Sequence, residues 1–581
     1  MTSNIQDGCM KIMNNIRIYI LGVFIFCFCL CNFINGQKLV YLEYSETLTF
    51  DQKRLPDAQI LKGNVRFKHD DMLMFCDSAY FYDKSNSIDA FGNVRFEQGD
   101  TLYGYGDILY YDGNTRLARV RNNVRLIHRE TILTTDSLNY DRLKGVAYYF
   151  GSGTIRDSIN TLQSQLGFYT PSTNQAIFRK KVSLENSSFS MSKDTLYYNT
   201  ESHIAKLVSP TNILYEGETT ILSSNGLYNT ETEQSNLYNR SKIIHQDGKT
   251  LIGDTILYNK ITGFGKFIGH IEAVDTVQQV TLKGNYCELY EHSNTGFVTD
   301  SALVIDWSQE DTTYMHADTI FADQIQVRLY RLLPQDSILQ DSVMVAQSPD
   351  TLWVDTAYQQ MRAFHNVRVY HPDYQLVCDS LVYHDQDSVI ILYHLPICWS
   401  NNSQMSADSI YMYLKNQELD YAHGFGNALT IQQVSSNYFN QMMGKEMKAF
   451  IREGDLRQVD VNGNAETIFY PENDDGSFMG VNRTQSSFVK LFLKEKKIQR
   501  VVFTTRTTGI MYPIDQVTPE QTKLVGFFWA IDERPTKPQD VFLTPQHTYR
   551  PEQQAVSAVE EEPIEEEAIK PRPKRNRKKA N

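Results

Sequence analysis

The chain has 581 residues, a formal net charge of −13 and a composition that is 41% hydrophobic and 12% aromatic. The apolar and aromatic content excludes wholesale disorder, and the acidic balance argues against a nucleic-acid-binding protein. A chain of this length usually divides into three or four globular domains, so a single repetitive body would be an exception.

Residues 1–36 are typical of an export signal. Lys11 and Arg17 precede an apolar run that ends near Ile34, and the small residue Gly36 follows. We therefore predict a signal peptide over residues 1–36, cleaved after Gly36. A retained membrane anchor is the alternative, because the run is close to the minimum length for a membrane span. The four cysteines beyond this leader are widely scattered, which favours free thiols over a zinc site or a disulfide framework.

A phrase of about six residues recurs along the body of the chain at steps of 29 or 30 residues. Its first copies open at Asp77, Asp107, Asp136, Gln165, Asp194, Ser224, Asp254 and Gly284. A looser stretch follows at Asp318 and Asp350, and the spacing returns at Asp379, Asp408 and Asn437. Such a period predicts stacked repeats that contact mainly their neighbours. We expect the recurring Asp to cap a turn or ladder rather than to act as a catalytic acid.

A second phrase, Gly-Asn-Val-Arg-Phe or a close variant, begins at Gly63, Gly92, Asn122 and His365. Alternating apolar and polar residues, rich in Val, Ile, Tyr and Phe, predict β-strands around both phrases. The predicted fold is therefore all-β, an elongated and repetitive β-jellyroll or β-solenoid-like trough built from units of about 30 residues.

In the second phrase the apolar residues face one side of the strand and the arginine faces the other. Stacking aligns the apolar side chains into a stripe of lipid-groove candidates, namely Val65, Phe67, Val94, Phe96, Val124, Leu126, Val367 and Val369. The sequence leaves open whether this stripe is a sealed core or an open groove. The arginines of the same phrases are possible phosphate contacts, namely Arg66, Arg95, Arg125 and Arg368; a solvated outer face is the alternative.

Catalytic motifs are missing from the sequence. It contains no GxSxG, HExxH, P-loop or complete GxGxxG pattern. We therefore predict a protein that is not an enzyme, with no catalytic residues, no cofactor and no metal site.

The repeated phrases resemble the OstA/LptA superfamily, and the ordered set resembles its large OstA-like form. Further matching stretches begin at Asp311, Arg362, Cys378, Asn440 and Val461. The resemblance implies a twisted β-jellyroll trough that holds acyl chains of lipopolysaccharide and pairs with other β-jellyroll transport components through its strand edges. The small bridge proteins of the superfamily are less than half as long as this chain, so their role is not carried over whole.

Together these observations predict four regions: a signal peptide (1–36), a repetitive OstA-like β-jellyroll (37–440), a C-terminal OstA-like β portion or cap (441–535), and a disordered acidic-then-basic tail (536–581). The predicted function is lipid binding in the periplasm, with possible association with the outer membrane, in support of lipopolysaccharide transport and outer-membrane assembly. Lipopolysaccharide or a related glycolipid is the expected ligand, and nucleic acid is not expected as a partner. The alternatives are a structural or adhesive β-solenoid with a sealed core and, third, a β-solenoid enzyme acting on polysaccharide.

Overall fold

A computed structural model describes residues 39–332, 351–416, 418–452, 454–473, 475–494 and 497–543. The predicted signal peptide and most of the predicted tail lie outside these residues. The chain divides into two compact units, unit 1 (Met1–Ala273) and unit 2 (Val274–Asn581). No helix in the described ranges is long and apolar enough to cross a membrane.

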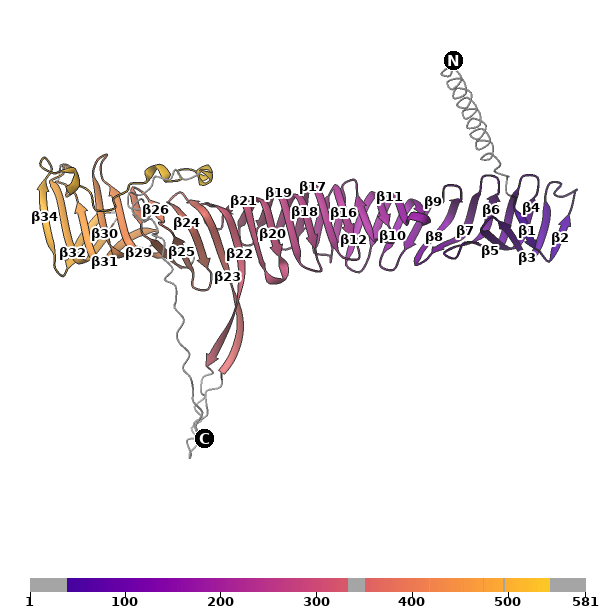
Figure 1. Cartoon of the computed structure of the whole chain (residues 1–581), viewed down its shortest axis with the longest axis horizontal. Coiled ribbons are helices and arrows are strands. Elements are labelled where there is room, and N and C mark those ends of the chain that lie inside the picture. The colour runs from indigo at the N-terminus through magenta and orange to yellow at the C-terminus, as the bar shows by residue number, and fades with distance from the viewer. Residues whose placement is uncertain are drawn as a thin grey trace, which may run out of the picture. The chain divides into compact units, whose positions relative to one another are not determined.

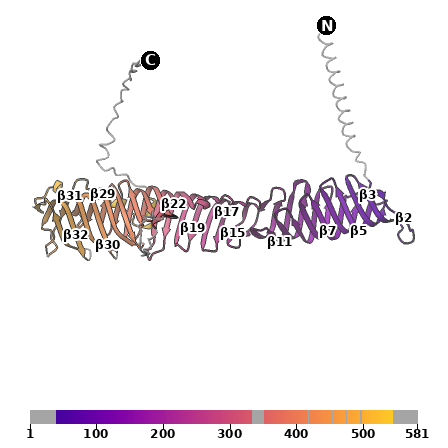
Figure 2. The ribbon, with the colours of Figure 1, turned by 90° about the horizontal axis from the view of Figure 1, so that it is seen from below.

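Unit 1 is a stack of antiparallel strands that pair with their neighbours in chain order (Figure 1; Figure 2). Most strands have 10 to 12 residues, and two of them make one sequence repeat. The strands are β1 (Tyr41–Tyr44), β2 (Thr47–Phe50), β3 (Gln59–His69), β4 (Met72–Tyr82), β5 (Ser87–Gln98), β6 (Leu102–Asp112), β7 (Leu117–His128), β8 (Thr131–Asp141), β9 (Val146–Arg156), β10 (Thr161–Thr170), β11 (Gln175–Glu185), β12 (Phe189–Asn199), β13 (Ile204–Leu207), β14 (Thr211–Tyr215), β15 (Thr219–Ser223), β16 (Asn225–Asn229), β17 (Gln234–His245), β18 (Lys249–Asn259) and β19 (Phe264–Asp275), with a short 3-10 helix η1 (Pro171–Thr173).

Unit 2 continues the antiparallel pattern with more variable strand lengths. Its β-strands are β20 (Val280–Tyr290), β21 (Thr295–Asp306), β22 (Thr313–Leu332), β23 (Thr351–Tyr370), β24 (Tyr374–His384), β25 (Val389–Tyr393), β26 (Ile397–Ser400), β27 (Ser403–Ser406), β28 (Ser409–Lys415), β29 (Glu418–Gln433), β30 (Phe439–Arg452), β31 (Asp455–Phe469), β32 (Gly480–Lys494), β33 (Lys497–Thr504) and β34 (Thr508–Pro513). Its 3-10 helices are η2 (Glu291–Ser293), η3 (Pro519–Gln521), η4 (Ile531–Glu533) and η5 (Pro538–Phe542). The all-β repetitive fold class predicted from the sequence is confirmed.

The Gly-Asn phrases form corners at which a strand bends. Gly63 and Asn64 have φ of 80° and 45°, and Gly92 and Asn93 have 75° and 45°. Glycine and asparagine adopt positive φ at the lowest cost, and the strand pairing shifts register at both places. Each corner is therefore a β-bulge that divides a strand into two arms. Arm A is the set of strand halves that carry the predicted stripe residues, and arm B is the set of the other strand halves.

The recurring Asp of the first phrase caps the corner of a neighbouring strand. The Asn93 side-chain amide donates to Asp77 Oδ2 at 2.8 Å, and the Asn123 amide donates to Asp107 Oδ2 at 2.7 Å. In unit 2 the equivalent Asn366–Asp318 bond is 3.0 Å long. This pairing confirms that the Asp caps a ladder, and it explains why both phrases repeat with the same period.

The core lies between the two arms, because alternate side chains of each arm point inward. Arm A contributes side chains such as Phe67 and Phe96, and arm B contributes Leu109 and Tyr111, all at most 1% exposed. The cysteines at 76, 287, 378 and 398 are free thiols, as expected.

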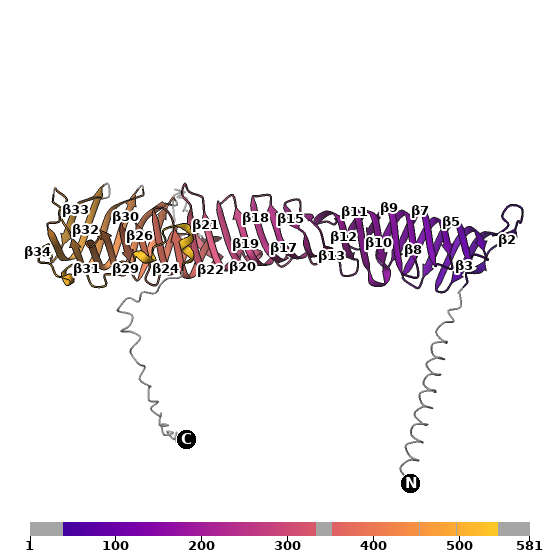
Figure 3. The same cartoon turned by 90° about the horizontal axis from the view of Figure 1, so that it is seen from above.

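Two features of unit 2 interrupt the regular repeat. Strands β22 and β23 have 20 residues each and form a hairpin longer than its neighbours (Figure 1), which accounts for the looser spacing after Asp318. Beyond β34, residues 514–543 form a strap that lies beside β24 and β26, in yellow in Figure 3. The strap includes η5, so folded structure continues beyond residue 535, where we expected the tail to begin.

Candidate functional site

All eight predicted stripe residues lie in the interior on arm A. Their exposed fractions run from 0% for Val65, Phe67, Phe96 and Val367 to 5% for Val369. The expected alternation of faces is therefore present in both units. The stripe is an apolar interior surface, and the described conformation keeps it from solvent.

The stripe packs tightly against its neighbours. Phe96 stacks on Tyr140 of arm B with ring centroids 6.2 Å apart. The same ring fills the space over Gly104, where an added Cβ would lie 2.0 Å from it. An acyl chain that enters this region must therefore displace side chains or separate the arms, since a close-packed interior has no spare volume.

Three of the four predicted arginines lie on the outer face of arm A. Arg66 pairs with Glu43 at 2.9 Å and Arg95 pairs with Glu97 at 3.2 Å. Arg95 also lies over the Phe75 ring, 4.3 Å from its centroid. Strand pairing aligns these groups in one row across β3 to β7, in the order Arg66, Phe75, Arg95, Tyr105, Arg125. We call this alternation of cations and aromatic rings the arginine row.

The row ends at an open depression of about 720 Å³ near the corners of β7 to β11. Most of its lining residues have polar side chains, and they include the cations Arg125 and Lys181 and the acid Asp136. Such a lining suits a hydrophilic group better than an acyl chain.

Arg368 differs from the other three arginines. It also points outward from arm A, but it is only 3% exposed because the strap covers it. Its guanidinium donates to the Glu533 carbonyl oxygen at 2.5 Å. The prediction of a phosphate contact at Arg368 is therefore set aside, since this side chain already holds the peptide backbone of the strap.

Polar contacts join the free ends of the two arms in unit 1. We call the free ends of arm A lip A and the free ends of arm B lip B. The lip A end of one strand contacts the lip B end of the strand three positions further along the chain. His69 bonds to the Tyr111 hydroxyl at 2.6 Å, and His128 bonds to the Tyr169 hydroxyl at 2.8 Å. Between them, the Tyr140 hydroxyl donates to Gln98 Oε1 at 2.9 Å. These contacts bridge the opening between the arms.

Ion pairs reinforce the same closure. Arg142 of lip B donates to Asp71 of lip A at 2.6 Å and to the Tyr111 hydroxyl at 2.9 Å. The Arg142 side chain is only 4% exposed whereas the Asp71 side chain is 60% exposed, so the guanidinium is buried but its carboxylate partner remains in water. Arg116 pairs with Asp70 at 3.2 Å.

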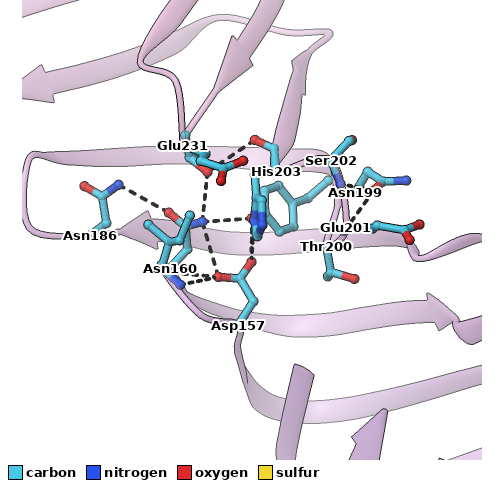
Figure 4. Close-up of polar contacts among 12 residues, drawn as sticks. Asp157, Asn160, Asn186, Asn199, Thr200, Glu201, Ser202, His203 and Glu231 are labelled. Carbon is cyan, nitrogen blue, oxygen red and sulfur yellow. Dashed lines mark hydrogen bonds and ion pairs between the residues drawn. The ribbon is translucent and has the colours of Figure 1, made fainter. Parts of the chain in front are cut away.

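A bridge with several members centres on Asp157 (Figure 4). Its carboxylate, with a side chain 3% exposed, accepts from the Tyr198 hydroxyl at 2.5 Å and from the Asn160 backbone N–H at 2.7 Å. His203 Nδ1 lies 3.5 Å from the carboxylate. Burial, and then the charge of Asp157, raise the pKa of Tyr198, so its hydroxyl stays protonated and donates. The Asn160 amide also donates to Thr230 of lip B at 2.8 Å. Because these polar groups satisfy one another, the network holds the two lips together.

One interior cation stands out on arm A. Lys193 is 9% exposed, and its Nζ has no hydrogen-bond partner among the described residues. Burial lowers the pKa of Lys193 to about 8, as expected when an ammonium group loses water. It places an amine inside the otherwise mainly apolar interior.

Sequence reasoning found the stripe but missed the lips. A signal was present, because the last tyrosine of the first phrase recurs at 111, 140, 169 and 198. Its partners His69, Gln98, His128 and Asp157 lie 41 or 42 residues earlier. Strand alternation places these tyrosines inward, which marks them as polar groups that need partners.

The fold and its interior define an all-β repeat protein with two facing arms around an apolar stripe. Residues 37–194 match the family model described as OstA-like protein. The chain is therefore OstA-like over this segment, which contains six of the eight stripe residues, and the resemblance drawn from its repeated phrases is confirmed there. The family is related to lipopolysaccharide transport. No match was found among the curated proteins.

Proposed function

We propose that this chain is a non-enzymatic, periplasmic lipid-binding protein that assists lipopolysaccharide transport to the outer membrane and outer-membrane assembly. The observation that carries the proposal is the buried apolar stripe on arm A, six of whose eight residues lie within the OstA-like segment. Acyl chains that leave a bilayer need such an apolar path, and each buried methylene contributes about 0.8 kcal/mol.

Lipid entry in this proposal requires the lips to separate. The stripe is buried and the lips are bridged by His69, His128 and Asp157 with their partners. When the lips separate, water replaces these contacts, and acyl chains pack against the stripe where arm B packed before. The sugar and phosphate groups of the glycolipid then remain at the lips, in water and near Arg116 and Arg142.

The burial of the stripe also favours a second candidate, a structural β-solenoid with a permanently sealed core. The two candidates differ in one property, because only a lipid-binding protein must open its lips. A covalent clamp across the lips therefore distinguishes them.

The clamp joins cysteines introduced at Asn160 and Thr230, whose side chains are 2.8 Å apart, with a short bismaleimide. A matched control joins cysteines at Thr134 and Thr154, which are adjacent on the outer face of arm A. We expect uptake of a fluorescent lipopolysaccharide to slow at least tenfold in the lip-clamped chain and to stay unchanged in the control. Equal uptake by both, or no lipid binding by the unclamped chain, would instead support the sealed scaffold.

A further inference from the structure

The depression at the corners of β7 to β11 lies where the arginine row of unit 1 loses its aromatic rings. In the earlier repeats, Phe75 and Tyr105 stand between the arginines of the row. Beyond them the row continues through Thr134, Thr154 and Gln163, which pair across β8, β9 and β10. A threonine at the position of a ring leaves the space over the sheet unfilled, so the surface is hollow here.

The same corners also lack the Asp–Asn cap of the preceding repeats. Asp136 is the recurring corner Asp of its repeat, but Ser152 stands at the position where Asn123 caps the preceding corner. The next corner has Gln165 and Lys181 in these two positions. Within the described ranges, the side chains of Asp136, Gln165 and Lys181 form no hydrogen bond or ion pair. These polar groups are therefore available to a ligand.

The depression has the form of a trough that crosses the strands. Its middle line consists of residues that point into the interior, such as Val124 and Ser164, which are 2% and 5% exposed. The residues on either side of that line point outward, because successive side chains of a strand alternate. One outward row runs from Arg125 on β7 to Gln163 on β10, and the other ends at Lys181 on β11. The trough spans about 19 Å from β7 to β11, so it is far longer than a single ion.

The lining combines hydroxyl, amide, carboxylate and cationic groups. The hydroxyls of a saccharide both donate and accept hydrogen bonds, so they can pair with every member of such a set. Arg125 and Lys181 lie on the two outermost strands of the trough, and Asp136 lies between them. Cations at both ends suit acid groups on the ligand, while the carboxylate suits hydroxyl donors.

We propose that this trough binds a short acidic oligosaccharide along its length. Arg125 and Lys181 hold the acid groups of the saccharide, and Asp136, Gln163 and Gln165 hold its hydroxyls. The lips lie at the opposite ends of the arms, about 17 Å from the corners for five residues of strand. The saccharide at the trough is therefore a different ligand from a glycolipid held at the lips, and its binding does not depend on the lipid binding proposed above.

Isothermal titration calorimetry on the full chain tests the ligand class with three trisaccharides of matched length. They are trigalacturonate, maltotriose carrying one phosphate group, and unmodified maltotriose. We expect at least one acidic form to bind tenfold or more tightly than maltotriose, and to weaken with added salt. The tighter of the two acidic forms identifies the acid group. Equal binding of all three, no binding of either acidic form, or displacement of the trisaccharide by an equal concentration of inorganic phosphate would overturn the proposal.

Filling the trough tests its position. Thr134→Tyr introduces the kind of ring that Phe75 and Tyr105 place at this point of their repeats, so the fold accommodates it. We expect this variant to bind the acidic trisaccharide at least tenfold more weakly. The matched control is Thr250→Tyr on β18, which adds the same ring to the outer face of arm A away from the trough and should change binding less than twofold.

Removing the cations tests their role in the same titration. The pair Arg125→Gln and Lys181→Gln should weaken binding of the acidic trisaccharide at least tenfold. The matched pair Arg66→Gln and Lys68→Gln removes two cations from the same face at β3 and should change binding less than twofold. Equal losses in the two pairs would refute a site at the trough.

The lip clamp described above separates this site from lipid binding. A chain clamped between positions 160 and 230 should bind the acidic trisaccharide with an unchanged Kd, because the trough lies outside the lips. A tenfold loss in the clamped chain would overturn the assignment of the saccharide to the trough.

Discussion

Replacing Asp157 with alanine tests the closure of the lips in the most direct way. The substitution leaves three donors without their acceptor: the Tyr198 hydroxyl and the backbone N–H groups of Ile159 and Asn160. A buried donor left unsatisfied costs about 1–3 kcal/mol. Water reaches the two backbone groups once the turn loosens, and the Tyr198 hydroxyl keeps His203 Nδ1 as a partner at 3.2 Å, so we expect a loss of about 1–2 kcal/mol in local stability. That loss raises the equilibrium constant for local opening about 5- to 30-fold.

Hydrogen exchange measured by mass spectrometry checks this value, on peptides that contain residues 157–162 and 198–203. Asp136→Ala is the matched control, because Asp136 is an exposed Asp at a corner of the same unit. We expect exchange about 5- to 30-fold faster around Asp157 in the first variant, no change in the control, and faster lipid uptake in the first variant alone. Unchanged protection around Tyr198 would refute the argument that this network holds the lips together.

Three other predictions concern packing, pH and the strap. Gly106 and Gly253 occupy the same repeat position but differ in the space around them. A Cβ added at Gly106 would lie 2.4 Å from a Val120 methyl, whereas one added at Gly253 would lie 3.5 Å from its nearest neighbour. Gly106→Ala should therefore lower the free energy of unfolding, measured by thermal denaturation, by about 1–3 kcal/mol, while Gly253→Ala should leave it almost unchanged. Burial lowers the pKa of His128 from its ordinary value of 6.5, so the unfolded chain binds the proton first and the stability of the fold should decrease as the pH drops below about 6.5. In the variant His128→Gln, this part of the pH dependence of the melting temperature should disappear. If it persists, His128 is not its source. Gln404→Ala removes both hydrogen bonds to the strap backbone and should make the strap more sensitive to limited proteolysis, whereas Gln516→Ala, an exposed change on the strap itself, should leave cleavage unchanged.

The repeat, its strands and the facing of the stripe could be predicted from the sequence, because they depend on local patterns. Alternation along a strand decides which residues share a face, and Gly-Asn pairs mark positions where positive φ is easily adopted. The stripe and the corner Asp therefore followed from spacing alone.

The lips and the strap could not be predicted in the same way, because they depend on contacts between distant residues. The pairing of His69 with Tyr111 depends on the three-strand offset between the arms, which no local pattern encodes. The burial of Arg368 depends on Glu533, which lies 165 residues away. In both cases the identity of the residue suggested solvent exposure, and tertiary packing decided otherwise.

Photo-crosslinking from the two faces of arm A tests the central claim that lipid binds along the stripe. A benzophenone side chain introduced at Phe67 or Phe96 probes the interior, and one at Phe75 probes the outer face on a neighbouring strand. The account predicts crosslinks to lipopolysaccharide from positions 67 and 96 and none from position 75. Folded protein that gives no crosslink at either interior position, or crosslinks only at position 75, would contradict it.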